Sequence, residues 1–76
     1  MNIFDTVCTI LKEQLEIDES VELSEATLLD ELDADSLDVI EVVMALEDGF
    51  DIEFSDEEAE TVRSVGDLVE VISSKL

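Results

Sequence analysis

The sequence predicts an all-α fold: a small four-helix bundle of three longer helices and one short helix, with a long loop after the first helix. Apolar residues recur at spacings of three and four, the period of helices that bury one face. There is no proline and there are only two glycines, Gly49 and Gly66, whereas a β-sandwich needs many tight turns. With 76 residues the chain has room for one domain, which we expect to span residues 1–76.

The first helix is expected over residues 3–16, where five apolar side chains share one face: Ile3, Val7, Ile10, Leu11 and Leu15. Residues 17–35 show no sustained period and therefore predict a loop, whose leucines we expect to pack across the helix ends. A loop of this length in a small domain often carries function.

The second helix is expected to begin at Ser36 and to run to about Asp48. Asp35 is suited to cap its first turn, and Asp38 adds a second carboxylate near the positive end of the helix. Gly49 then fits the position at which a helix stops.

Two further helices are predicted near the C-terminus. Ser55 is suited to cap a short third helix that extends to Glu60. Ser64 and Asp67 match a capping box at the start of the last helix. Apolar residues again follow helical spacing there: Val65, Leu68, Val69, Ile72 and Leu76.

The charge is strongly one-sided, with 23 acidic residues against three basic ones and a net charge of −20. This field disfavours nucleic acid and membranes as partners, because nucleic acid and anionic lipid are bound through Lys and Arg. A basic patch on another protein would be attracted instead. The alternative is that the acidity only keeps a small protein soluble, and charge alone favours neither interpretation. We expect a monomer.

Cys8 is the only cysteine, which excludes an internal disulfide and a four-thiolate zinc site. Because it lies within a helical apolar pattern, a buried and inert thiol is favoured over a reactive one. The sequence shows neither a signal peptide nor an apolar run long enough to cross a bilayer, so we expect a cytoplasmic protein.

The expected second helix carries two apolar faces. One is an ordinary core stripe of Val39, Val42, Val43, Leu46 and Phe50. The other holds Leu37, Ile40 and Met44 and is surrounded by Glu41, Glu47 and Asp48. Apolar residues ringed by one sign of charge are typical of a docking surface for an oppositely charged partner. The alternative, a helix buried on both sides, is disfavoured because unpaired carboxylates are seldom buried.

The residue types exclude most catalytic chemistry. Without histidine there is no Ser-His-Asp or Cys-His nucleophile, and two isolated glycines make no phosphate-binding loop. A calcium-binding EF-hand starting at Asp33 fails at three required positions, which hold Leu37, Asp38 and Met44. We therefore expect neither an enzyme nor a dedicated metal site, while loose binding of divalent ions to carboxylates stays open.

Ser36 would place its hydroxyl at the exposed start of the second helix. Unpaired N–H groups and the positive end of the helix dipole would favour a phosphate attached there. Position alone, however, favours an ordinary serine at a helix start.

The tripeptide Asp35-Ser36-Leu37 stands at the head of the expected second helix. At these residues the sequence resembles the acyl carrier protein family, whose attachment motif is Asp-Ser-Leu. The similarity covers most of residues 28–72, through Asp38, Glu41, 43–47, Phe50-Asp51 and 56–60.

This resemblance implies a four-helix bundle in which Ser36 receives phosphopantetheine from coenzyme A through a separate phosphopantetheinyl transferase. The acidic second and third helices look like those of carriers for fatty-acid synthesis, whose enzymes would present basic patches. The alternatives are a specialised carrier for polyketide, aminoacyl or D-alanyl transfer, and an unmodified acidic binding module.

The resemblance also implies roles for other side chains. Acidic residues should meet Lys and Arg on partner enzymes: Asp35, Asp38, Glu41, Glu47 and Asp48. Leu37, Ile40 and Met44 should fill shallow apolar contacts. An expandable space for the acyl chain should be lined by Val39, Leu46, Ala59, Val62 and Leu68.

Three positions depart from the family pattern. Asp33 stands where many members have glycine, which adds charge and stiffens the turn before Ser36. Ser55 replaces a frequent proline, and Gly49 replaces an acidic residue and is expected to fray the end of the second helix.

Overall fold

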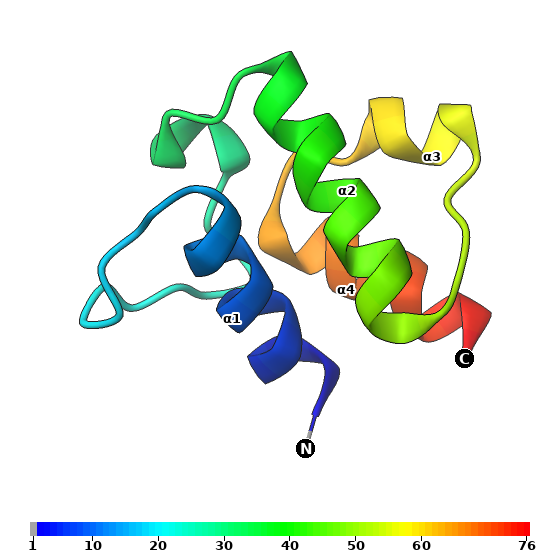
Figure 1. Cartoon of the computed structure of the whole chain (residues 1–76), viewed down its shortest axis with the longest axis horizontal. Helices are drawn as coiled ribbons and strands as arrows, with labels where there is room; N and C mark the ends of the chain where they lie inside the picture. The colour runs from blue at the N-terminus through cyan, green and yellow to red at the C-terminus, as the bar shows by residue number, and fades with distance from the viewer. Residues whose placement is uncertain (1) are drawn as a thin grey trace.

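The computed structural model describes residues 2–76 and contains four α-helices and one short 3₁₀ helix (Figure 1). The order along the chain is α1 (Ile3–Gln14), η1 (Leu29–Leu32), α2 (Ser36–Phe50), α3 (Asp56–Thr61) and α4 (Val65–Lys75). The predicted bundle of three longer helices and one short helix is confirmed, with a long connection after α1.

The core is built from pairs of apolar residues four positions apart on the three longer helices. α1 packs against both α2 and α4, and α3 packs against α2. The pairs are Val7 and Leu11, Val42 and Leu46, and Leu68 and Ile72, each side chain at most 2% exposed. Full burial of one such side chain contributes roughly 1.5–3 kcal/mol, so these pairs hold the three helices together.

The long connection between α1 and α2 is fastened at two places. Near its start, the Lys12 ammonium donates a hydrogen bond of 3.0 Å to the carbonyl oxygen of Glu19. Further along, the N–H groups of Val65 and Gly66 donate to the carbonyl oxygens of Thr27 and Glu25, at 3.0 and 2.9 Å. The first N–H groups of a helix have no partner within it. The loop therefore satisfies the start of α4 while it is itself held in place.

Serine caps begin the two C-terminal helices, as predicted. The Ser55 hydroxyl accepts from the N–H of Glu58 at 3.1 Å, and the Glu58 carboxylate accepts from the N–H of Ser55 at 2.8 Å. Ser64 and Asp67 form the same reciprocal pair at α4. Each capping box satisfies N–H groups at the start of its helix and fixes where that helix begins.

The expected stop of α2 at Gly49 is wrong, because the helix continues through Gly49 to Phe50. Asp51 ends it instead, in the left-handed conformation with φ of 56°, and its N–H donates to the carbonyl of Glu47. The two extra residues keep Phe50 on the same face as Leu46, where it packs against the core. Packing of one aromatic side chain outweighs the cost of a glycine inside the helix.

Within residues 2–76, every helix falls short of the length and apolar character that crossing a membrane requires.

Candidate functional site

The start of α2 is fixed by a reciprocal pair of hydrogen bonds. A carboxylate oxygen of Asp35 accepts from the N–H of Asp38 at 3.0 Å, and the Asp38 carboxylate accepts from the N–H of Asp35 at 3.2 Å. Two acidic side chains also complement the positive end of the helix dipole. Ser36 is consequently the first residue of α2, as predicted from the sequence.

Ser36 is exposed, and its hydroxyl takes part in neither of these hydrogen bonds. The N–H groups of Ser36 and Leu37 have no partner within α2, because they lie in its first turn. The side chain therefore offers a free hydroxyl next to backbone donors and the positive end of a 15-residue helix. A phosphate attached to this oxygen fits the environment electrostatically.

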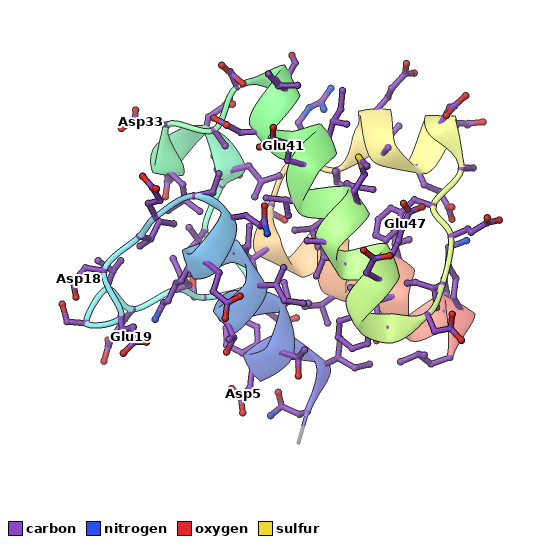
Figure 2. The ribbon with its side chains drawn as sticks, in the orientation of Figure 1. Asp5, Asp18, Glu19, Asp33, Glu41 and Glu47 are labelled. Atoms are coloured by element: carbon purple, nitrogen blue, oxygen red, sulfur yellow. The ribbon has the colours of Figure 1, made fainter. Side chains whose placement is uncertain are left out.

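The turn before α2 determines where Ser36 lies. η1 ends at Leu32, and Asp33 then adopts the left-handed conformation with φ of 58° and ψ of 27°. Ala34 is buried and its N–H donates to the carbonyl of Leu29 at 3.4 Å. Figure 2 shows Asp33 at the periphery, with its side chain directed away from the helices. The reversal at Asp33 directs the chain from η1 into the first turn of α2.

A cleft of about 680 Å³ opens beside Ser36, between η1, α2, α3 and the segment before α4. Six of its eleven lining residues are apolar and five are polar. The apolar residues are Leu29, Ala34, Val39, Ile40, Ala59 and Val62, and the polar ones are Asp30, Asp35, Ser36, Glu60 and Arg63. A hydroxyl beside a partly apolar cleft is suited to carry a group that can lie in that cleft.

The five residues expected to line an acyl space divide into two groups. Val39, Ala59 and Val62 line the cleft beside Ser36. Leu46 and Leu68 are both 0% exposed and lie in the closed core, outside the cleft lining. The cleft would have to open into the core to reach them, and their role as acyl contacts stays a prediction.

The outer face of α2 is exposed. Leu37, Ile40 and Met44 are 63%, 52% and 59% exposed, which excludes a helix buried on both sides. Glu41 and Asp48 are exposed on the same helix. We refer to these five residues as the outer face of α2. Three large apolar side chains beside carboxylates form a surface suited to a basic, partly apolar partner.

Glu47, also expected at the partner surface, has a contact within the protein. Its carboxylate accepts a 2.7 Å hydrogen bond from the N–H of Phe54, in the segment between α2 and α3. Figure 2 shows Glu47 near the end of α2 and Glu41 in its first half. The carboxylates of Asp35 and Asp38 likewise form hydrogen bonds in the helix cap. Glu41 and Asp48 are therefore the two acids of this set whose carboxylates are free to bind a partner.

In the described part of the chain, neither the Cys8 thiol nor the acidic side chains form a second reactive or metal-binding site. Cys8 is half-buried on α1, and burial raises the pKa of its thiol, which keeps it protonated and unreactive at neutral pH. Among residues 2–76, no three acidic or cysteine side chains are arranged to hold a metal ion.

Arg63 is the residue of this site that sequence reasoning missed. It lies 27 residues after Ser36 (63 − 36 = 27) and reaches the cleft only because the chain folds back before α4. The one signal in the sequence was its isolation, since no other basic residue occurs between Lys12 and Lys75.

Comparison with known proteins supports one family. The family model described as phosphopantetheine attachment site matches residues 5–72. The acyl carrier protein of Clostridium acetobutylicum is 50% identical over 72 residues, which cover 95% of this chain and 94% of that protein.

Solved structures of similar proteins share the fold. The crystal structure of an acyl carrier protein from Thermotoga maritima is 33% identical, with a TM-score of 0.83, and the match covers 96% of this chain and 85% of that one. The solution structure of holo acyl carrier protein from Geobacter metallireducens is 29% identical, with a TM-score of 0.84 and coverage of 99% and 86%.

The family match over nearly the whole chain, the half-identical relative and the shared fold together identify the protein. The chain belongs to the acyl carrier protein family and is a non-enzymatic carrier with a phosphopantetheine attachment site.

Proposed function

We propose that Ser36 carries the phosphopantetheine arm and that the protein delivers acyl intermediates to the enzymes of fatty-acid synthesis. The observation that carries this proposal is the exposed hydroxyl of Ser36 at the capped start of α2, beside a partly apolar cleft. When bound, the arm supplies a terminal thiol that holds the acyl group as a thioester.

Ser36 acts as a substrate when the arm is attached. Its Oγ forms the bond to phosphorus, the pyrophosphate bond of coenzyme A breaks, and the adenosine bisphosphate portion leaves. The hydroxyl proton passes to a base on the phosphopantetheinyl transferase, which fits a carrier that has no histidine. The unpaired N–H groups at the start of α2 then stabilise the phosphate that remains on Ser36.

The outer face of α2 begins next to Ser36, at Leu37, and supports recognition by partner enzymes. Leu37, Ile40 and Met44 provide exposed apolar area, and Glu41 and Asp48 provide negative charge. An enzyme with a basic patch near its active-site entrance would be steered toward the residue that bears the cargo. The proposal therefore assigns docking and delivery to the same helix.

Charge reversal tests this surface. Glu41→Lys together with Asp48→Lys should weaken binding to a fatty-acid synthesis enzyme and flatten its salt dependence, because two attractive charges become repulsive. Glu13→Lys together with Glu70→Lys, both at exposed positions outside α2, is the matched control and should change affinity little. Unchanged affinity of the double variant, with its helicity intact, would place the interface elsewhere.

The pathway is tested by which enzyme charges the arm. After attachment of phosphopantetheine, incubation with malonyl-CoA and a malonyl transferase should give a mass increase on the carrier. Incubation with an adenylating ligase and its amino-acid substrate should give none. Charging by the ligase alone would assign the protein to specialised acyl or aminoacyl transfer and contradict the fatty-acid proposal.

A further inference from the structure

Arg63 is the one basic residue that borders the cleft beside Ser36. The protein has three basic side chains, and two of them are engaged: Lys12 bonds to the carbonyl of Glu19, and Lys75 pairs with Glu58 at 2.9 Å. Arg63 forms no ion pair with any carboxylate of residues 2–76, although the protein carries 23 acidic residues. An unpaired guanidinium in so acidic a chain is available to an anion from outside the fold.

The orientation of this guanidinium is held by the backbone. Its Nη1 donates hydrogen bonds to the carbonyl oxygens of Glu60, at 2.8 Å, and Val62, at 3.3 Å. These carbonyls lie at the end of α3, where helical carbonyls lack partners. Because the guanidinium is planar, fixing Nη1 also limits where the remaining donors point. The donors on Nε and Nη2 bond to no protein group in the described chain.

Among the residues that line the cleft, only Arg63 can attract an anion. The carboxylates of Asp30, Asp35 and Glu60 repel an anion, whereas Val39, Ala59 and Val62 are apolar and carry no charge. Arg63 is itself exposed, so an ion pair formed there stays in partial contact with water and is sensitive to salt. Ser36 borders the same cleft, so a group attached to its hydroxyl enters the space that Arg63 faces.

We propose that Arg63 binds an anionic oxygen group of the arm and so holds the arm along the cleft. This inference rests on the proposed attachment at Ser36. Two groups share the required chemistry: the phosphodiester that joins the arm to Ser36, and the carboxylate of a dicarboxylic acyl cargo. The fork of N–H donors on arginine matches both, because each presents paired oxygens.

The test follows the side-chain Nε–H signal of Arg63 in ¹H–¹⁵N spectra of four forms of the protein: apo, holo, butyryl-loaded and succinyl-loaded. A shift on going from apo to holo identifies the phosphodiester. A shift that appears only with succinyl identifies the carboxylate. Either shift should shrink at about 1 M salt, where the screening length falls to about 3 Å.

Two variants separate this contact from general effects of the arm. In Arg63→Gln, the changes that loading causes in the amide signals of Ala59 and Val62 should be reduced. Lys12→Gln removes the same charge on α1, outside the cleft lining, and should leave those changes as in the unmodified sequence. Circular dichroism of each variant checks that the helices are retained.

The contradicting outcomes are distinct. An unchanged Arg63 Nε signal in all loaded forms would overturn the inference and leave attachment at Ser36 intact, provided that intact mass shows the arm in place. A shift with butyryl alone would show an apolar contact and would also overturn it. Absence of the arm by mass would overturn the proposed function together with this inference.

Discussion

The N–H of Gly66 donates a 2.9 Å hydrogen bond to the carbonyl oxygen of Glu25, and a Cβ atom at Gly66 would lie 2.9 Å from that same oxygen. The start of α4 and the long loop therefore meet backbone to backbone, with no room for a side chain. At the other glycine, Gly49, a Cβ atom would meet only the terminal methyl of Ile10, at 3.0 Å. The two glycines differ in whether their neighbour can move.

Alanine substitutions at these glycines should have opposite effects. Gly66→Ala should destabilise the protein by about 1 kcal/mol, because overpacking against backbone costs about 1–3 kcal/mol and the helix propensity of alanine recovers about 1 kcal/mol. Gly49→Ala should stabilise it by about 0.5 kcal/mol, since the end of Ile10 can rotate away. Urea unfolding midpoints measure both. Stabilisation by Gly66→Ala would mean that the loop is not held closely against α4.

The helix starts were predictable because their signals are local. Each cap, at Asp35, Ser55 and Ser64, pairs with a residue three positions along the chain, so both partners can be recognised from a short stretch of sequence. The end of α2 was not predictable in this way. Gly49 looks like a stop, and only the packing of Phe50 against other helices extends the helix past it.

The site was predictable in its attachment residue and less so in its surroundings. Ser36 and the outer face of α2 follow from a motif and a helical period. The contacts of Arg63 with the cleft and of Gly66 with Glu25 join distant parts of the chain, so they depend on the tertiary approach of α4 to the loop. The 3₁₀ helix at Leu29–Leu32 has only four residues, which is too short for a repeating pattern of apolar residues to reveal it in the sequence.

Asp33 should gain stability on replacement by glycine. Its left-handed backbone is costly for residues with a Cβ atom and least so for glycine. Asp33→Gly should raise the free energy of unfolding by about 0.5 kcal/mol, and Asp33→Ala should lower it by about 1 kcal/mol. Both variants remove the same charge, so the difference between their unfolding midpoints isolates the backbone effect. Equal midpoints would contradict it.

Glu47 should matter for folding more than Glu41 does. Glu47→Ala removes the acceptor of the 2.7 Å bond from the N–H of Phe54 and should cost about 1–2 kcal/mol. Glu41→Ala is the control on the same helix, exposed and without such a bond, and should stay within about 0.5 kcal/mol of the unmodified sequence. Thermal unfolding compares them. A loss at Glu41 as large as that at Glu47 would refute this division of roles.

Glu58 should contribute to stability in a pH-dependent way. The hydrogen bond from the N–H of Ser55, followed by the contact with Lys75, lowers the pKa of Glu58 below its ordinary value of 4.5. A carboxyl whose pKa is lower in the folded protein than in the unfolded chain stabilises the folded protein at pH values above its unfolded pKa. This stabilisation is lost as the pH falls through its pKa in the folded protein. Glu58→Gln should therefore be less stable than Glu57→Gln at neutral pH.

The stability difference between these two glutamine variants should shrink as the pH drops below 4.5, because Glu58 then becomes protonated in the Glu57→Gln variant, which retains it. Glu57 is exposed on the same turn, so its variant corrects for the loss of one charge from a very acidic protein. Denaturant melts across the acidic range measure the difference. A difference that is constant with pH would exclude the proposed role of the Glu58 carboxylate.

The attachment of the arm at Ser36 is tested most directly by intact mass spectrometry after treatment with coenzyme A and a phosphopantetheinyl transferase. The unmodified sequence should gain one phosphopantetheine per molecule, and Ser36→Ala should gain none. Ser73→Ala, which changes an exposed serine on α4, should gain the arm as the unmodified sequence does. No adduct on the folded protein, or an adduct that persists in Ser36→Ala, would contradict the account.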